Sequence, residues 1–153
     1  MAVRRGYGDE TWRMAREGDR AGLQRAADLL LQDADLNYEG HRARAFAFAV
    51  EGRRDDALEQ LHEGWTEEWP FPAAYATDVA RVRFLAGDYD EALTALHLAV
   101  RSSEQLDEAV AALATDCVRR SRRTFRKALG VALAGGSSTQ KAGAALALIR
   151  ARF

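Results

Sequence analysis

The stretch that decides the fold is Ala86-Gly87-Asp88-Tyr89-Asp90-Glu91-Ala92-Leu93, which joins one apolar helical segment to the next. A similar frame surrounds Gly52, and a shorter one surrounds Gly18. The three glycines lie 34 and 35 residues apart. A repeat of this length, with a glycine turn between two helical segments, is typical of arrays of helical hairpins. The chain is therefore predicted to be all-α.

The composition fits one helical protein without covalent cross-links. Of its 153 residues, 48% are hydrophobic and 29% charged, and only Cys117 is a cysteine. A single cysteine excludes an internal disulfide framework. The first residues lack the apolar core of a signal peptide, and no run approaches the roughly 18 apolar residues of a membrane span. We expect a cytoplasmic protein that does not enter a membrane.

Apolar residues at helical spacing predict a helix on each side of every glycine turn. Pro70 and Pro72 separate the second helix pair from the third, because proline cannot continue a helix. Ser137 and Gln140 form a capping box that predicts the start of a last helix. The predicted pairs, of which the fourth is degenerate, and the last helix span residues 9–33, 38–66, 72–101, 105–134 and 138–152.

Small residues recur at equivalent positions of the second and third pairs, where they allow two helix backbones to approach closely. They are Ala45, Ala57 and Gly64 in the second pair and Ala80, Ala92 and Ala99 in the third. With this pattern the chain resembles the tetratricopeptide repeat over roughly residues 9–101. The resemblance implies a right-handed α-solenoid of three to four antiparallel helix pairs with a C-terminal capping helix. We expect a single helical-repeat domain over residues 1–153.

A second repeat family shares part of one segment. Residues 94–100 resemble the opening of an ankyrin helix. An ankyrin array needs a glycine-containing β-turn just before Thr94, whereas residues 90–93 continue a helical pattern. The tetratricopeptide pattern is therefore the preferred interpretation.

The resemblance implies a non-catalytic protein-interaction module whose groove is lined by the first helix of each pair. Aromatic residues there are expected to anchor a protein or peptide partner, and arginines to orient its acidic group. For Phe46 and Phe84 the alternative is that their rings fill the core between repeats. The predicted partner-binding residues are Trp12, Arg16, Arg42, Phe46, Thr77, Arg81 and Phe84.

Groups that could carry chemistry are sparse. His62 and His97 occupy equivalent repeat positions, and repetition alone explains their spacing. No pair of His or Cys lies three or four residues apart, as a metal site on a helix would need. Cys117 lies on an apolar helix face, as a buried small hydrophobic residue would. We expect no catalytic residue, no metal site and no cofactor.

The charges divide unevenly along the chain. Residues 1–116 carry 13 basic and 23 acidic side chains, a net charge of −10, whereas residues 117–153 carry nine basic and no acidic ones, a net charge of +9. We call residues 119–127 the basic segment; its cations are Arg119, Arg120, Arg122, Arg123, Arg126 and Lys127. Three roles fit it: docking on the acidic repeats of its own chain or of a second copy, binding an acidic protein, or binding nucleic acid nonspecifically.

The last predicted helix carries an apolar stripe. It consists of Ala142, Ala145, Leu146, Ile149 and Phe153. Burial of each large side chain contributes about 1.5 to 3 kcal/mol, more than exposed ion pairs do. The stripe is therefore expected to dock this helix on the repeats, or to form a homo-oligomer through the C-terminal helices.

Overall fold

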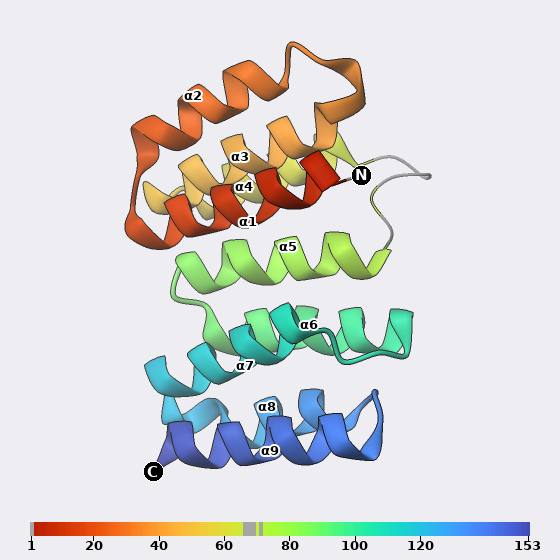
Figure 1. Ribbon diagram of the computed structural model, residues 1–153. Coiled ribbons are helices and arrows are strands. Elements are labelled where there is room, and N and C mark those ends of the chain that lie inside the picture. The colour runs from red at the N-terminus through yellow and green to blue at the C-terminus, as the bar shows by residue number, and fades with distance from the viewer. Residues whose placement is uncertain (1, 66–69, 71) are drawn as a thin grey trace. The chain divides into compact units, whose positions relative to one another are not determined.

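The computed structural model describes residues 2–65, 70 and 72–153, with side chains from residue 10 on. Within these ranges the chain is helical between its turns and has no strand, so the all-α prediction is confirmed. Residues 66–69 and 71, which the sequence predicts to end the second pair and lead into the third, lie outside the described residues. The elements are α1 (Ala2–Glu17), α2 (Arg20–Leu30), η1 (Ala34–Leu36), α3 (Asn37–Val50), α4 (Arg54–Gly64), α5 (Pro72–Leu85), α6 (Tyr89–Ser103), α7 (Glu108–Arg120), η2 (Arg122–Thr124), α8 (Phe125–Leu133) and α9 (Ser138–Arg152) (Figure 1).

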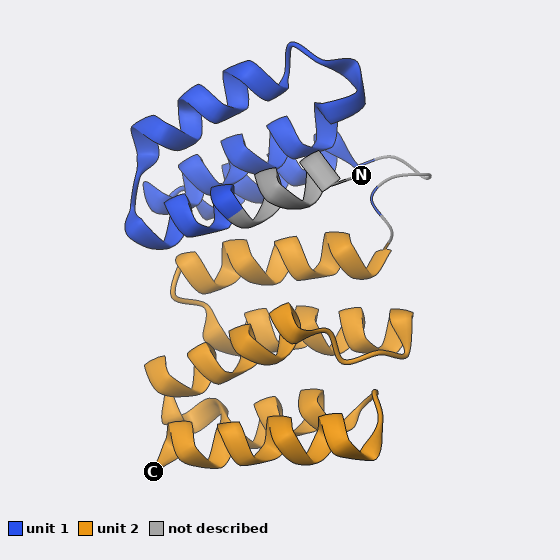
Figure 2. Ribbon diagram, in the orientation of Figure 1, with its two compact units in different colours: residues 1–71 blue, residues 72–153 orange. Residues whose placement is uncertain are grey.

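The chain forms two compact units, residues 1–71 and residues 72–153 (Figure 2). In the first unit, α3 packs against α1, α2 and α4. In the second, α6 packs against α5, α7 and α8, and α9 packs against α7 and α8. A single repeat domain over residues 1–153 stays a prediction.

The three repeated glycines end α1, α3 and α5, as predicted. Gly18, Gly52 and Gly87 have φ values of 73°, 81° and 83°, in the left-handed region that glycine enters without a Cβ clash. The amide after each glycine donates to the carbonyl five residues earlier, at 2.9 Å in all three turns. The donor and acceptor pairs are Asp19 and Met14, Arg53 and Phe48, and Asp88 and Arg83. One turn geometry therefore recurs at the predicted period.

The small residues of the second and third pairs lie at helix contacts. Ala45 on α3, Ala57 on α4, Ala80 on α5 and Ala92 on α6 are each 0% exposed. The leucines that follow one turn later, Leu61 and Leu96, are also fully buried. Within each pair, α3 with α4 and α5 with α6, the helices pack together. The predicted close approach of backbones is therefore present in both pairs.

Helix ends are less predictable than turns. The first helix begins at Ala2 rather than near residue 9. Gly6 and Gly8 lower the helix propensity of this segment, but propensity predicts the start of a helix only weakly. The last helix begins as predicted: the Ser137 hydroxyl accepts from the Gln140 amide, and the Gln140 side chain accepts from the Ser137 amide.

The prediction that the apolar stripe docks α9 on the chain's own repeats is wrong, and a homo-oligomer through this stripe stays a prediction. Leu148 is the buried large residue of this helix, whereas Ala142, Leu146, Ile149 and Phe153 are exposed and Ala145 is half-buried. Most positions from 142 to 151 are alanine, leucine or isoleucine, so nearly every side of the helix is apolar. Spacing alone therefore does not select the face that packs inward.

Candidate partner-binding surfaces

In the first unit, three of the predicted partner-binding residues lie together. The Trp12 and Phe46 rings are 5.6 Å apart between centroids, and the Arg16 guanidinium lies 5.9 Å from the Trp12 ring. Arg42 lies on α3, with its guanidinium 5.9 Å from the Tyr38 ring. Phe46 is 0% exposed, so its ring fills the core, while Trp12 is half-buried and Arg16 is exposed.

In the second unit, the three predicted residues lie along α5. The Thr77 hydroxyl donates to the Ala73 carbonyl at 2.8 Å. Arg81 donates to the nearly buried Asp78 carboxylate at 3.0 Å. Phe84 is buried, with its ring 5.5 Å from that of Tyr89. Phe84 therefore contributes to packing, while Thr77 and Arg81 remain half-buried at the surface of α5.

The cations of the basic segment are spread over α7, η2 and α8, and two of the six form ion pairs with described residues. Lys127 donates to Asp90 on α6 at 2.7 Å, and Arg119 pairs with Asp116 one turn earlier at 3.4 Å. Among the described residues, the other four cations form no ion pair, and all four are exposed: Arg120, Arg122, Arg123 and Arg126. In the described part of the chain, the ion pair of Lys127 with Asp90 is therefore the one that joins this segment to another helix, while α8 also packs on α6.

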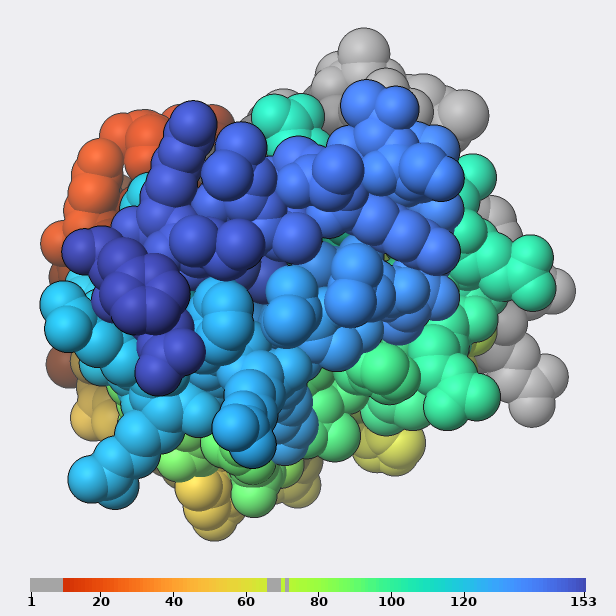
Figure 3. All heavy atoms as spheres, turned by 90° about the horizontal axis from the view of Figure 1, so that it is seen from below, coloured from red at the N-terminus to blue at the C-terminus, as the bar shows by residue number. Residues whose placement is uncertain are grey.

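The exposed sides of α8 and α9 form a surface that we call the C-terminal face. It consists of Arg126, Gly130 and Leu133 on α8 and Ala142, Leu146 and Ile149 on α9. Leu133, Leu146 and Ile149 are 51%, 48% and 45% exposed. The two helices lie side by side, in blue, across the view in Figure 3. The sequence analysis predicted burial for the α9 part of this face and did not single out Leu133.

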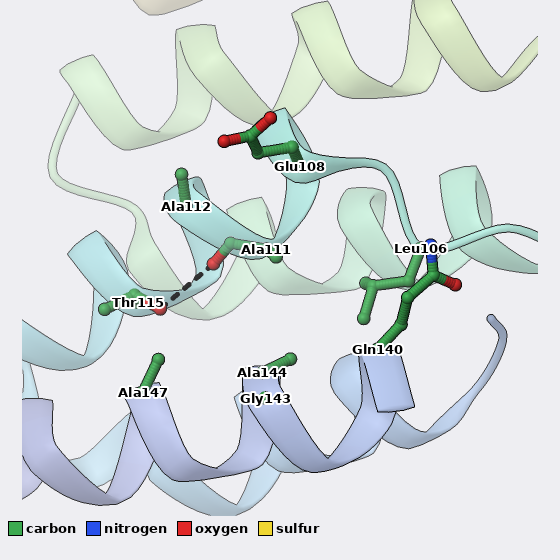
Figure 4. A pocket seen from close by; sticks show the side chains of 9 residues that line it. All are labelled: Leu106, Glu108, Ala111, Ala112, Thr115, Gln140, Gly143, Ala144 and Ala147. Carbon is green, nitrogen blue, oxygen red and sulfur yellow. Dashed lines mark hydrogen bonds between the residues drawn. The ribbon is translucent and has the colours of Figure 1, made fainter. Parts of the chain in front are cut away.

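A cavity of about 360 Å³ lies between α7 and α9 (Figure 4). Small side chains from both helices point into it, and the Thr115 hydroxyl donates a hydrogen bond to the Ala111 carbonyl at 3.0 Å. The sequence analysis missed this cavity, although the helical spacing of Gly143, Ala144 and Ala147 is a signal that could have found it. The lining residues are Leu106, Glu108, Ala111, Ala112, Thr115, Gln140, Gly143, Ala144 and Ala147.

Cys117 is fully buried on α7, and burial, together with the charge of Asp116, raises the pKa of its thiol to about 12. A raised thiol pKa keeps the sulfur protonated, and the thiolate is the reactive form. At about pH 8 we expect the folded chain to react with a disulfide reagent at least about 100-fold more slowly than the chain in denaturant. Absorbance of the released thiolate measures both rates. Prompt reaction of the folded chain would show that Cys117 is accessible and ionised.

Within the described ranges, His, Cys, Asp and Glu form no group of three or more that could hold a metal ion. No helix in the same part of the chain has both the length and the apolar character to cross a bilayer.

A scan against protein-family models finds no match, and searches of curated proteins and of solved structures find none either.

Proposed function

We propose that this chain is a non-catalytic module of tetratricopeptide-like repeats that binds a protein or peptide partner. Its helix pairs would form a right-handed solenoid capped by α9. The observation that supports the proposal is the recurrence of one turn and one contact: glycines with φ near 80° end α1, α3 and α5, and buried alanines lie at equivalent contacts of two pairs. In repeats built in this way the interior residues pack against neighbouring helices, so residues that bind a partner lie on the surface.

The proposed binding surface follows the first helix of each pair. In the first unit, Trp12 with Arg16 over its ring combines the two residue types most often found at energetic centres of interfaces. Arg42 in the same unit, and Thr77 and Arg81 in the second unit, would add polar contacts. Arginine suits a carboxylate because its guanidinium donates two parallel hydrogen bonds.

The test is affinity capture from an extract of the source organism, with nuclease treatment in one arm. A protein that is captured in both arms and forms a complex with the purified chain on size-exclusion chromatography supports the proposal. Arg16→Glu should weaken that complex, whereas Arg25→Glu, at an exposed position on α2, should not. Capture that disappears with nuclease, or the absence of any protein that forms a complex, contradicts the proposal.

Nonspecific nucleic-acid binding is the second candidate, because Arg120, Arg122, Arg123 and Arg126 are exposed without an ion pair in the described part of the chain. Phe125 is the one aromatic residue between these arginines in the sequence, and Arg152 lies 5.0 Å from its ring and from that of Phe153. Sequence-tolerant binding of single strands relies on several such aromatic platforms.

We expect labelled DNA and RNA to show no submicromolar binding at about 150 mM salt. Fluorescence anisotropy measures it. If the segment instead neutralised about six phosphates, affinity would fall by ~10³ to 10⁵ between about 50 and 200 mM salt, and Arg122→Glu with Arg123→Glu would abolish it. That result would replace the protein-binding proposal.

A further inference from the structure

Exposed apolar side chains concentrate on the last two helices. The described part of the chain has six large hydrophobic residues that are exposed: Leu29, Leu98, Leu133, Leu146, Ile149 and Phe153. Three of them belong to the C-terminal face, and Phe153 follows α9 directly. Single exposed leucines are ordinary, whereas a group on neighbouring helices marks a site of interaction.

The spacing of the C-terminal face suits a third helix. Arg126, Gly130 and Leu133 on α8 stand four and three residues apart, and Ala142, Leu146 and Ile149 on α9 do the same, so each set lines one side of its helix. A Cβ placed on Gly130 would meet no atom within 4 Å. On two helices that pack together, large side chains form ridges and small residues leave grooves between them. The side chains of another helix can pack into these grooves.

The charge is positive at the end of this face where α8 begins and α9 ends. Arg152 lies 5.0 Å from the Phe125 ring, so the end of α9 lies beside the start of α8. Arg126 and Arg150 are therefore exposed near the same end of the helix pair. No acidic residue occurs from residue 117 to 153, so the chain's own last segment supplies no counter-charge to them.

We infer that the C-terminal face binds an acidic amphipathic helix of a partner protein, an inference that rests on the proposed function in taking the partner to be a protein. Apolar residues of that helix cover Leu133, Leu146 and Ile149, and its carboxylates face Arg126 and Arg150. α9 has 15 residues and is about 22 Å long, which matches a partner helix of about four turns.

Charge also argues against the other occupants. A second copy presenting the same face would bring no acidic residue from its residues 117–153 to Arg126 and Arg150, so it would leave both charges without a counter-charge. A nucleic acid would pair with the arginines and leave the apolar side chains without contacts. An acidic amphipathic helix satisfies both features at once.

The test uses a labelled synthetic peptide of about 18 residues, with leucines at helical spacing and glutamates elsewhere. A matched peptide carries lysines in place of the glutamates. In fluorescence anisotropy at about 150 mM salt, we expect the wild-type chain to bind the glutamate peptide and not the lysine peptide. The variant carrying Leu146→Glu and Ile149→Glu should bind the glutamate peptide at least about tenfold more weakly, because it loses apolar contacts and gains like charges.

Leu98→Glu is the matched control, because Leu98 lies on α6 and is 57% exposed; it should leave peptide binding unchanged. If the double variant melts earlier than the wild type, Arg126→Ala with Arg150→Ala tests the same face through its charges and should also weaken binding several-fold. Equal binding of both peptides, or unchanged binding by these variants, overturns the inference.

Two further outcomes also overturn it. One is a dimer, seen by light scattering, that the double variant loses, since a second copy would then cover the face. The other is binding to phosphatidylserine vesicles with which the glutamate peptide does not compete. If the wild-type chain captures a cellular partner through Arg16 but does not bind the glutamate peptide, this inference fails and the proposed function stands. If the wild-type chain captures no protein, the proposed function itself fails.

Discussion

Phe46→Ala should lower the free energy of unfolding by about 3 to 5 kcal/mol, the largest single effect we expect in this chain. Phe46 is 0% exposed on α3, and its ring lies against that of Trp12 on α1. Removing the ring deletes apolar contacts and leaves a cavity that surrounding helices fill only in part. Small domains are stable by only about 5 to 15 kcal/mol. The first unit of the variant should therefore unfold at a lower urea concentration than that of the wild type.

Urea unfolding followed by circular dichroism measures this effect. Leu29→Ala is the control, because Leu29 is exposed on α2 and its truncation should change stability by less than about 0.5 kcal/mol. The pair also separates the two roles considered for Phe46. A Phe46→Ala chain that is as stable as the wild type but loses its partner would assign Phe46 to binding rather than to the core.

Ala92→Leu is the second large effect, with an expected loss of about 1 to 3 kcal/mol. Ala92 is fully buried in the first turns of α6, in the pair that α6 forms with α5. A leucine there needs space that the close helix contact does not contain, so the helices must move apart or adopt strained rotamers. The melting temperature of the variant measures the cost.

Ala112→Leu provides the comparison for this prediction, because Ala112 is exposed on α7 and can accept a larger side chain. Leucine is also a good helix former, so little change in stability is expected there. An unchanged melting temperature for Ala92→Leu would mean that this contact is not tight, and the proposed repeat register would then be wrong.

Turns and small-residue contacts could be predicted from the sequence because each has a local cause. Gly52 and Gly87 occupy backbone conformations that other residues enter only with strain, so the sequence at those points nearly dictates the turn. Ala57 and Ala92 lie one repeat apart because each occupies the equivalent contact between the two helices of its pair. The capping box at Ser137 is likewise fixed by two side chains and two amides.

The outward face of α9 could not be predicted, because the choice depends on partners that are distant in sequence. Leu146, Leu148 and Ile149 have similar hydrophobicity, and only the positions of α7 and α8 decide that Leu148 packs inward. For the same reason, Phe46 and Trp12 were both predicted as anchors, although the structure buries one and leaves the other half-buried. Neither periodicity nor composition records which side of an apolar helix meets its neighbour.

The packing of unit 2 also bears on how this part of the chain folds. Each of its helices, from α5 to α9, contacts helices that follow or precede it closely along the chain. When two segments in contact are near each other in sequence, only a short loop must form to bring them together. The entropic cost of forming the contact is then small, and folding is fast. Detaching α9 breaks mainly its contacts with α7 and α8, so local opening should begin at this end and cost less than global unfolding. The C-terminal helix can thus exchange its amide hydrogens while α5 and α6 remain folded.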